Sequence, residues 1–112
     1  MSSSGGSDRI AICPGSYDPV TLGHVDVIER TAAIFDRVIV AVVREPRHKV
    51  PAFGIDDRLE FVADAISHLK NVETESFSEL VVGFAKRHEA AVIVKGLRAV
   101  SDFEWEFQMN HL

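Results

Sequence analysis

Three short runs of uninterrupted apolar residues constrain the fold of this chain more than any other feature of its sequence. They cover residues 10–13, 38–43 and 90–94. A strand that is buried on both faces of a parallel sheet has such an unbroken apolar sequence, whereas a strand exposed on one face alternates. Residues 72–76 do alternate, so we expect a fourth strand there in a less covered position. The pattern predicts a largely buried parallel sheet.

Amphipathic stretches with a helical period separate the expected strands. Their apolar stripes comprise Val25, Ile28, Ala32 and Phe35 within residues 24–35, then Leu59, Val62, Ala63, Ile66 and Leu69, and finally Leu80, Val81, Phe84 and Ala85. Asp56 and Asp57 suit the first turn of the second helix, and Ser76 with Glu79 predicts a capping box for the third. This alternation predicts an α/β fold with right-handed βαβ units and a doubly wound, Rossmann-like parallel sheet.

Composition narrows the class of protein. The chain has 112 residues, of which 46% are hydrophobic and 26% charged, so we expect one folded domain over residues 9–112 after a flexible leader at 1–8. A formal charge of −5 argues against general nucleic-acid binding. No apolar run is long enough to cross a membrane, and the leader does not resemble a signal peptide. With Cys13 as the single cysteine, we expect a cytoplasmic protein.

The segment after the first strand is the first candidate site, because doubly wound sheets bind ligands beyond the carboxyl ends of their strands. Gly15 permits a close approach of the backbone, and Ser16 offers a hydroxyl and an amide. Gly23 and His24 open the following helix, whose N-terminus favours a phosphate. The alternative is an ordinary turn with a capping histidine. The segment matches neither a Walker loop nor the G-x-G-x-x-G fingerprint.

Two further loops carry positive charge. Lys49, within a basic cluster after the second strand, is suited to a phosphate, although such clusters are usually solvated surface. Lys95 and Arg98 follow the fourth strand and suit phosphate oxygens, or alternatively an ion pair with Asp102 or Glu104. His48, His68, His88 and His111 show no paired metal-ligand spacing, so we expect no zinc site, and we interpret Cys13 as a small core residue rather than a nucleophile.

Three motifs, in order, carry a resemblance to a known family. They are Pro14-Gly15-Ser16-Tyr17-Asp18-Pro19 followed by Thr21-Leu22-Gly23-His24, then Lys95-Gly96-Leu97-Arg98, and then Asp102-Phe103-Glu104-Trp105-Glu106. The chain resembles the nucleotidyltransferase superfamily with its T/H-x-G-H motif and, within it, the bacterial phosphopantetheine adenylyltransferases. The resemblance covers Arg9 to the last residue, with Trp105 where the family usually has tyrosine.

The resemblance implies an enzyme of coenzyme A biosynthesis that transfers an adenylyl group from ATP to 4′-phosphopantetheine, releasing pyrophosphate. It implies Mg²⁺ on the triphosphate, coenzyme A as a feedback ligand, and a homo-oligomer, which is a hexamer in the family. The implied catalytic residues are His24 and Lys49. The implied phosphopantetheine contacts are Ser16, Lys49, Val81 and Lys95, and the implied ATP contacts are Ser16, Tyr17, His24, Gly96, Leu97, Arg98 and Glu106.

Two of these assignments have alternatives. The loop after the second strand is one residue longer than is usual for the family, so counting back from Phe53 gives Lys49, whereas counting forward from Pro46 gives His48. We favour Lys49 for its charge. Val81 also fits the core stripe of its helix.

The end of the sequence affects the functional prediction. The chain stops at Leu112 within a helical pattern, whereas family members continue with a serine-rich segment that helps to bind ATP. We therefore expect the C-terminal part of the domain to be missing. One alternative function is a module that binds phosphopantetheine or coenzyme A without turnover. Another is a sibling transferase that uses CTP or a nicotinamide mononucleotide.

Overall fold

A computed structural model describes residues 8–46 and 50–94 of the chain. Strands and helices alternate along this part of the sequence. In order, they are β1 (Ile10–Gly15), α1 (Leu22–Ile34), β2 (Arg37–Val43), α2 (Ile55–Ala65), β3 (Val72–Phe77), α3 (Val81–Arg87) and β4 (Val92–Ile93). The alternation predicted from the apolar runs is confirmed.

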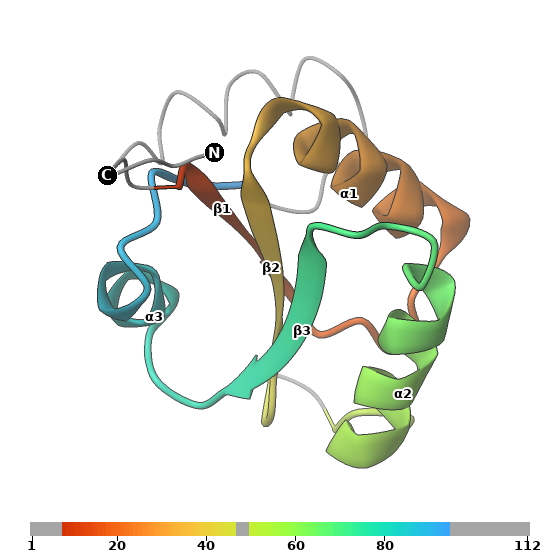
Figure 1. Cartoon of the computed structure of the whole chain (residues 1–112). Coiled ribbons are helices and arrows are strands. Elements are labelled where there is room, and N and C mark those ends of the chain that lie inside the picture. The colour runs from red at the N-terminus through yellow and green to blue at the C-terminus, as the bar shows by residue number, and fades with distance from the viewer. Residues whose placement is uncertain (1–7, 47–49, 95–112) are drawn as a thin grey trace.

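The strands form a parallel sheet in the order β3-β2-β1-β4. Helices α1 and α2 cover one face of this sheet, and α3 covers the other (Figure 1). The chain adds β2 and β3 on one side of β1 and then returns to place β4 on the other side. This reversal is the mark of a doubly wound sheet, so the predicted fold class is confirmed.

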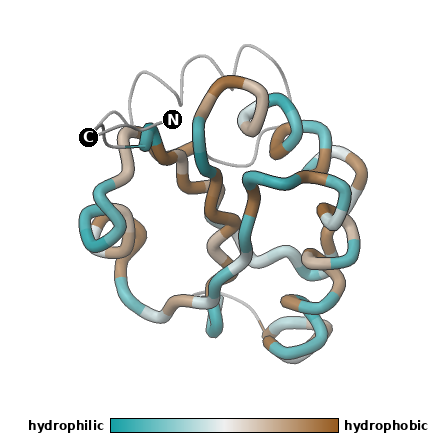
Figure 2. The backbone as a smooth tube through the Cα atoms, viewed as in Figure 1, coloured by the Kyte–Doolittle hydropathy of each residue, from teal (hydrophilic) through white to brown (hydrophobic). Residues whose placement is uncertain are grey.

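Apolar side chains fill the space on both faces of the sheet. On the face of α1 and α2, alternate residues of β1 and β2 pack with Ile28 and Val62. On the opposite face, the intervening strand residues pack with Phe84 of α3. Figure 2 shows the consequence as predominantly hydrophobic strands β1 and β2 beside a more hydrophilic β3. Strand β3 lies at the edge of the sheet, as its alternating sequence predicts.

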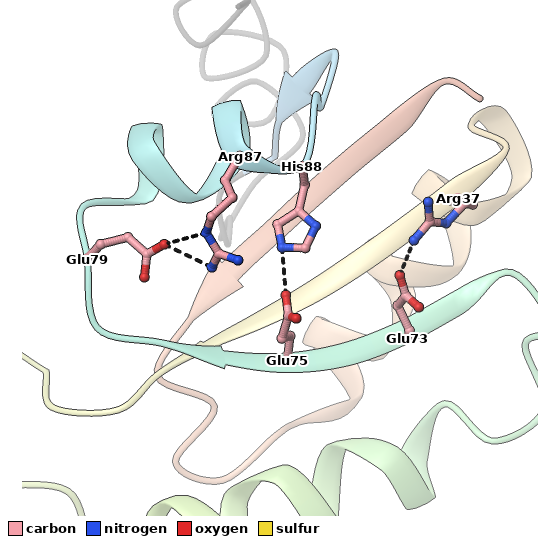
Figure 3. Close-up of polar contacts among 6 residues, drawn as sticks. All are labelled: Arg37, Glu73, Glu75, Glu79, Arg87 and His88. Carbon is pink, nitrogen blue, oxygen red and sulfur yellow. Dashed lines mark hydrogen bonds and ion pairs between the residues drawn. The ribbon is translucent and has the colours of Figure 1, made fainter. Parts of the chain in front are cut away.

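Polar contacts join α3 to the edge strand and its following turn (Figure 3). The Arg87 guanidinium Nη2 donates to Glu79 Oε2 at 2.9 Å, and His88 Nε2 lies 2.7 Å from Glu75 Oε1. Arg37 of β2 pairs with Glu73 on β3. Surface ion pairs of this kind contribute little energy individually, about 0–1 kcal/mol. The contacts of Arg87 and His88 join the C-terminal end of α3 to β3 and the turn after it, while apolar packing of Phe84 holds α3 on the sheet.

The boundaries of α1 and α2 differ from those expected. Helix α1 begins two residues before His24, so His24 lies inside its first turn. Helix α2 ends at Ala65, although the apolar stripe continues to Leu69. Ser67 Oγ donates to the carbonyl oxygen of Asp64 at 3.0 Å, and such local bonds compete with the helix ladder.

The predicted capping box of Ser76 and Glu79 is wrong. Ser76 belongs to β3, where it pairs with Val42, and its hydroxyl accepts a hydrogen bond from the guanidinium of Arg44. Helix α3 instead begins after Leu80, which provides no side-chain cap. Pairing with β2 therefore places Ser76 in β3 rather than at the N-terminus of α3.

No described helix combines the length and apolar character that crossing a membrane requires.

The N-cap of α2 provides a test of local stability. Gly54 occupies this position with φ −66° and ψ 167°, makes no side-chain cap, and has no atom within 4 Å of the place a Cβ would occupy. We expect Gly54→Ser to raise the free energy of unfolding by about 0.3–0.5 kcal/mol, because it adds a cap acceptor and restricts the unfolded chain. Urea denaturation measures the change.

The matched control is Gly54→Ala, which restricts the unfolded chain equally but has no acceptor. We expect its free energy of unfolding to stay close to that of the parent chain, because alanine is a poorer N-cap than glycine and this offsets the restriction of the unfolded chain. Equal stabilisation by serine and alanine would contradict the role of the cap.

Candidate active site

The loop that leaves β1 is shaped by the buried ring of Tyr17. This residue adopts a left-handed conformation with φ 47°, and its hydroxyl donates to the carbonyl oxygen of Cys13 at 2.9 Å. A Cβ on Gly15 would lie 3.1 Å from the Tyr17 ring, so a residue without a side chain fits best there. Ser16 lies between these two residues and is partly exposed. The loop thus presents Ser16 directly beyond the carboxyl end of β1.

His24 and Thr21 form a capping box at the start of α1. Thr21 Oγ1 accepts from the His24 backbone N–H at 3.2 Å, and the Thr21 backbone N–H donates to His24 Nδ1 at 3.0 Å. Because Nδ1 accepts a hydrogen bond from a backbone donor, the proton of the neutral imidazole is on Nε2. His24 therefore offers an N–H donor from its Nε2 atom.

Partial burial sets the charge of His24. The rings of His24 and Tyr17 pack in an edge-on arrangement, with their centroids 4.8 Å apart. Burial lowers the pKa of His24 below its usual 6.5. The imidazole is consequently neutral at neutral pH. It donates a hydrogen bond without carrying a full positive charge.

The N-terminus of α1 adds main-chain donors to the same place. The N–H groups at the first positions of a helix have no partner within the helix, and the helix dipole makes them attractive to anions. Leu22 and Gly23 occupy these positions and are exposed, and Gly23 has no side chain to obstruct an approach. With His24, this helix start has the donors that a phosphate group requires.

The segment before α2 is tied to the β1–α1 loop by a residue that sequence reasoning missed as a contact. The carboxylate of Asp18 accepts hydrogen bonds from the backbone N–H groups of Phe53, at 2.8 Å, and Ala52, at 2.5 Å. This bridge joins positions 34 and 35 residues apart in the sequence. The loops after β1 and β2 are therefore adjacent, as the topology predicted.

Arg58 is a second residue that the sequence analysis missed. Its guanidinium is buried and donates to backbone carbonyl oxygens at the ends of β1 and β2. One signal was available in the sequence, because Arg58 falls on the apolar stripe of α2 at helical spacing between Ile55 and Val62. An arginine in that position requires polar partners inside the fold.

The remaining expected site residues are only partly within the described ranges. Val81 is the first residue of α3, where it is partly buried and packs against the apolar cluster around Phe84. Both interpretations of Val81 are compatible with that position. The other candidates, namely Lys49 with its alternative His48, and Lys95, Gly96, Leu97, Arg98 and Glu106, lie outside the described residues.

Two other features contribute no chemistry here. Cys13 is buried, and desolvation raises the pKa of its thiol to about 12, which confirms its interpretation as a core residue rather than a nucleophile.

A cleft of about 410 Å³ between α2 and β3 is lined by Val72, Glu73 and Thr74 from the start of β3. It therefore lies at the end of the sheet opposite to His24.

The fold and the loop after β1 define a class of protein. A doubly wound parallel sheet whose first strand leads through a loop into a helix start is an α/β fold of the nucleotidyltransferase type. The profile of the cytidylyltransferase-like family matches residues 12–112. The chain belongs to this family.

Curated relatives and a solved structure extend this assignment. The chain is 56% identical over 100 residues to the phosphopantetheine adenylyltransferases of Heliobacterium modesticaldum and Gloeobacter violaceus, covering 89% of this chain in both cases. It spans 59% and 62% of the lengths of these relatives. The lipopolysaccharide core biosynthesis protein of Thermoplasma volcanium shares the fold, with a TM-score of 0.64 at 14% identity over 92% of this chain and 88% of that one.

The lowered pKa of His24 predicts how pH affects stability. The unfolded chain binds a proton at His24 near pH 6.5, whereas the folded chain binds it only at a lower pH. The contribution of His24 to the free energy of unfolding is therefore complete above pH 6.5 and is lost as pH falls towards the folded pKa. We expect His24→Gln to remove this loss, because glutamine keeps the acceptor of a capping box but does not titrate.

Urea denaturation of both proteins at about pH 7 and about pH 5 measures the effect. The two proteins should have similar stability at the higher pH, and His24→Gln should be the more stable at the lower pH. Parallel pH profiles would contradict the depressed pKa. An NMR titration of the imidazole reports the same pKa directly.

Proposed function

We propose that the protein transfers the adenylyl group of ATP to 4′-phosphopantetheine, giving dephospho-coenzyme A and pyrophosphate. A terminal phosphate oxygen of phosphopantetheine attacks the α-phosphorus of ATP, and the bond from that phosphorus to the pyrophosphate leaving group breaks. The substrate assignment is carried by the 56% identity to two phosphopantetheine adenylyltransferases over most of the chain.

The chemistry requires no protein nucleophile, because the attacking group is already an anionic phosphate. Catalysis then consists of positioning the two substrates and stabilising charge in the transition state. The hydrogen bond from Thr21 to His24 Nδ1 supports a role for His24 Nε2 as the donor to the α-phosphate. The exposed start of α1 supports the binding of phosphate oxygens beside it.

The roles of the other residues follow the family resemblance. We propose that Ser16 contacts both substrates, that Tyr17 contributes through its backbone, and that Val81 contacts the pantetheine arm. Lys49 and Lys95 would align the attacking phosphate and reduce its repulsion from ATP. Gly96, Leu97, Arg98 and Glu106 would line the ATP site.

Mg²⁺ is proposed to accompany ATP. Within residues 8–46 and 50–94, no group of three or more His, Cys, Asp or Glu side chains is placed to hold a metal ion. We propose that the ion is coordinated mainly by phosphate oxygens and water, where it would neutralise charge on the leaving pyrophosphate. We also propose a cytoplasmic homo-oligomer with coenzyme A as a feedback ligand, on the family resemblance alone.

His24→Ala tests the proposed chemistry. In the full-length protein with ATP, Mg²⁺ and phosphopantetheine, we expect the variant to reduce kcat by about 10²–10³, as the loss of a preorganised donor to a developing charge typically does. A pyrophosphate-release assay measures turnover. A reduction below about tenfold would show that His24 does not have this role.

His24→Gln is the matched control, because it preserves the cap of α1 while removing the imidazole. Its kcat should fall although its stability at neutral pH does not. Turnover equal to that of the parent protein would assign His24 to capping alone.

Substrate measurements separate the proposed reaction from its alternatives. Calorimetry with phosphopantetheine and with coenzyme A, run beside the pyrophosphate assay, identifies a binding-only module if binding occurs without release. A comparison of ATP with CTP identifies a sibling transferase. Pyrophosphate release that requires both ATP and phosphopantetheine is the result the proposal expects.

A further inference from the structure

Arg58 combines a charge with nearly complete burial, which no other side chain in the described part of the chain does. Its exposed fraction is 1%, and it lies in the first turn of α2. A buried guanidinium is costly unless its donors are satisfied. The hydrogen-bond partners of Arg58 therefore show which segments of the chain this residue connects.

All four hydrogen bonds of the guanidinium that the structure contains go to main-chain carbonyl oxygens. Nε donates to Phe53 at 2.9 Å, and Nη2 donates to Arg44 at 2.8 Å. Nη1 donates both to Val43, at 2.8 Å, and to Ser16, at 3.0 Å. The planar fork of the guanidinium suits this arrangement, whereas a lysine ammonium has only three donors around a single point.

These acceptors come from three segments that meet at the carboxyl edge of the sheet. Ser16 directly follows β1, Val43 ends β2 and Arg44 follows it, and Phe53 precedes α2. One side chain thus joins the loop that carries Ser16 and leads to His24 both to the end of β2 and to the segment before α2. The proposed function assigns phosphate contacts to Ser16 in the first of these loops and to His24, which follows it.

Asp18 joins the same loops, but it accepts hydrogen bonds where Arg58 donates them. Its carboxylate accepts from the amides of Ala52 and Phe53, while Arg58 donates to the carbonyl oxygen of Phe53. The main chain at Phe53 is therefore held on both its N–H and its C=O. A contact of this kind leaves little freedom for one loop to shift against the other.

We propose that Arg58 is a positioning residue for the adenylyl transfer, which rests on the proposed function. It touches neither substrate. It acts by holding the β1–α1 loop, which carries Ser16 and leads to His24, in a fixed place against the end of β2 and the segment at Phe53. Displacing a reacting group by about 1 Å is enough to reduce a rate by about 10²-fold, so the spacing of the two loops determines turnover.

Arg58→Lys in the full-length protein tests this proposal, because it keeps the positive charge but cannot reproduce the four-carbonyl arrangement. We expect kcat to fall by about 10- to 100-fold at a temperature at which the variant is folded, with changes of less than about threefold in the KM values. Steady-state pyrophosphate release and a thermal melt are measured on the same preparation.

The matched control is Val62→Ala, one turn further along α2. Val62 is fully buried in the apolar core and makes no contact with the loops through polar atoms, so its truncation lowers stability alone. We expect Val62→Ala to lower the melting temperature and to leave kcat within about twofold at a temperature at which it is folded. Equal kcat values for Arg58→Lys and Val62→Ala would overturn the proposal and assign Arg58 to stability only.

Hydrogen exchange provides a readout that does not depend on activity. In Arg58→Lys, the amide of Phe53 should exchange at least about tenfold faster than in Val62→Ala, while the amides of β1 remain protected in both. Unchanged protection at Phe53 would overturn the clamping of the loops. A parent protein that releases no pyrophosphate would instead overturn the proposed function, and the exchange result would still decide whether Arg58 holds the loops.

Asp18→Asn replaces Arg58→Lys if the latter does not fold. The amide has one acceptor oxygen in place of the two that receive Ala52 and Phe53, so it weakens the same bridge from the opposite loop. The expected result is again a lower kcat with faster exchange at Phe53. A kcat equal to that of the parent protein would contradict the proposal.

Discussion

The pairing of β1 with a parallel strand on each side is the constraint on which the rest of the structure depends. β2 lies on one side of β1 and β4 on the other, so the connections α1 and α3 leave to opposite faces of the sheet. Both faces must then be apolar, which is why Ile12 and Cys13, neighbours in sequence, pack into different cores. The order of the strands reverses at β1, and an open sheet of this kind has its ligand-binding crevice beyond the carboxyl end of the strand at such a reversal. The loop with Ser16 and His24 starts at that point.

Apolar packing positions the strands but cannot position the loops that follow them. The main-chain carbonyls at Ser16, Val43 and Arg44 turn inward where the sheet ladder ends, and each buried carbonyl without a partner would cost about 1–3 kcal/mol. A single guanidinium satisfies them together and also reaches Phe53. The same side chain therefore closes the polar edge of the core and connects the two loops, so the stability of that edge and its geometry are not independent.

The strands could be predicted from the sequence because burial on two faces leaves an unbroken apolar run, and the order of elements followed from that. The boundaries of α1 and α2 could not, because they depend on polar contacts such as the one between Ser67 and Asp64. Ser76 shows the same limit, since its pairing with Val42 overrides a local capping pattern. For the site, the motif that contains Ser16 and His24 was visible from residue types. Arg58 stood out only as a charge on the apolar stripe of α2, and the contacts of Arg58 and Asp18 were missed because their partners are main-chain atoms, which residue types do not reveal.

The capping box of α1 links the start of a helix to the protonation of a candidate catalytic group. Thr21 donates its backbone N–H to His24 Nδ1, so the bond that stabilises the first turn also places the imidazole proton on Nε2. Protonation of Nδ1 at low pH would break that bond, and partial burial of the ring opposes the same protonation. Both effects favour the neutral tautomer with a donor at Nε2. A glutamine at position 24 would also cap the helix but presents no imidazole N–H, so capping alone does not require a histidine there. The placement of that donor beside the exposed start of α1, where anions are favoured, supports the proposed contact of His24 with a phosphate.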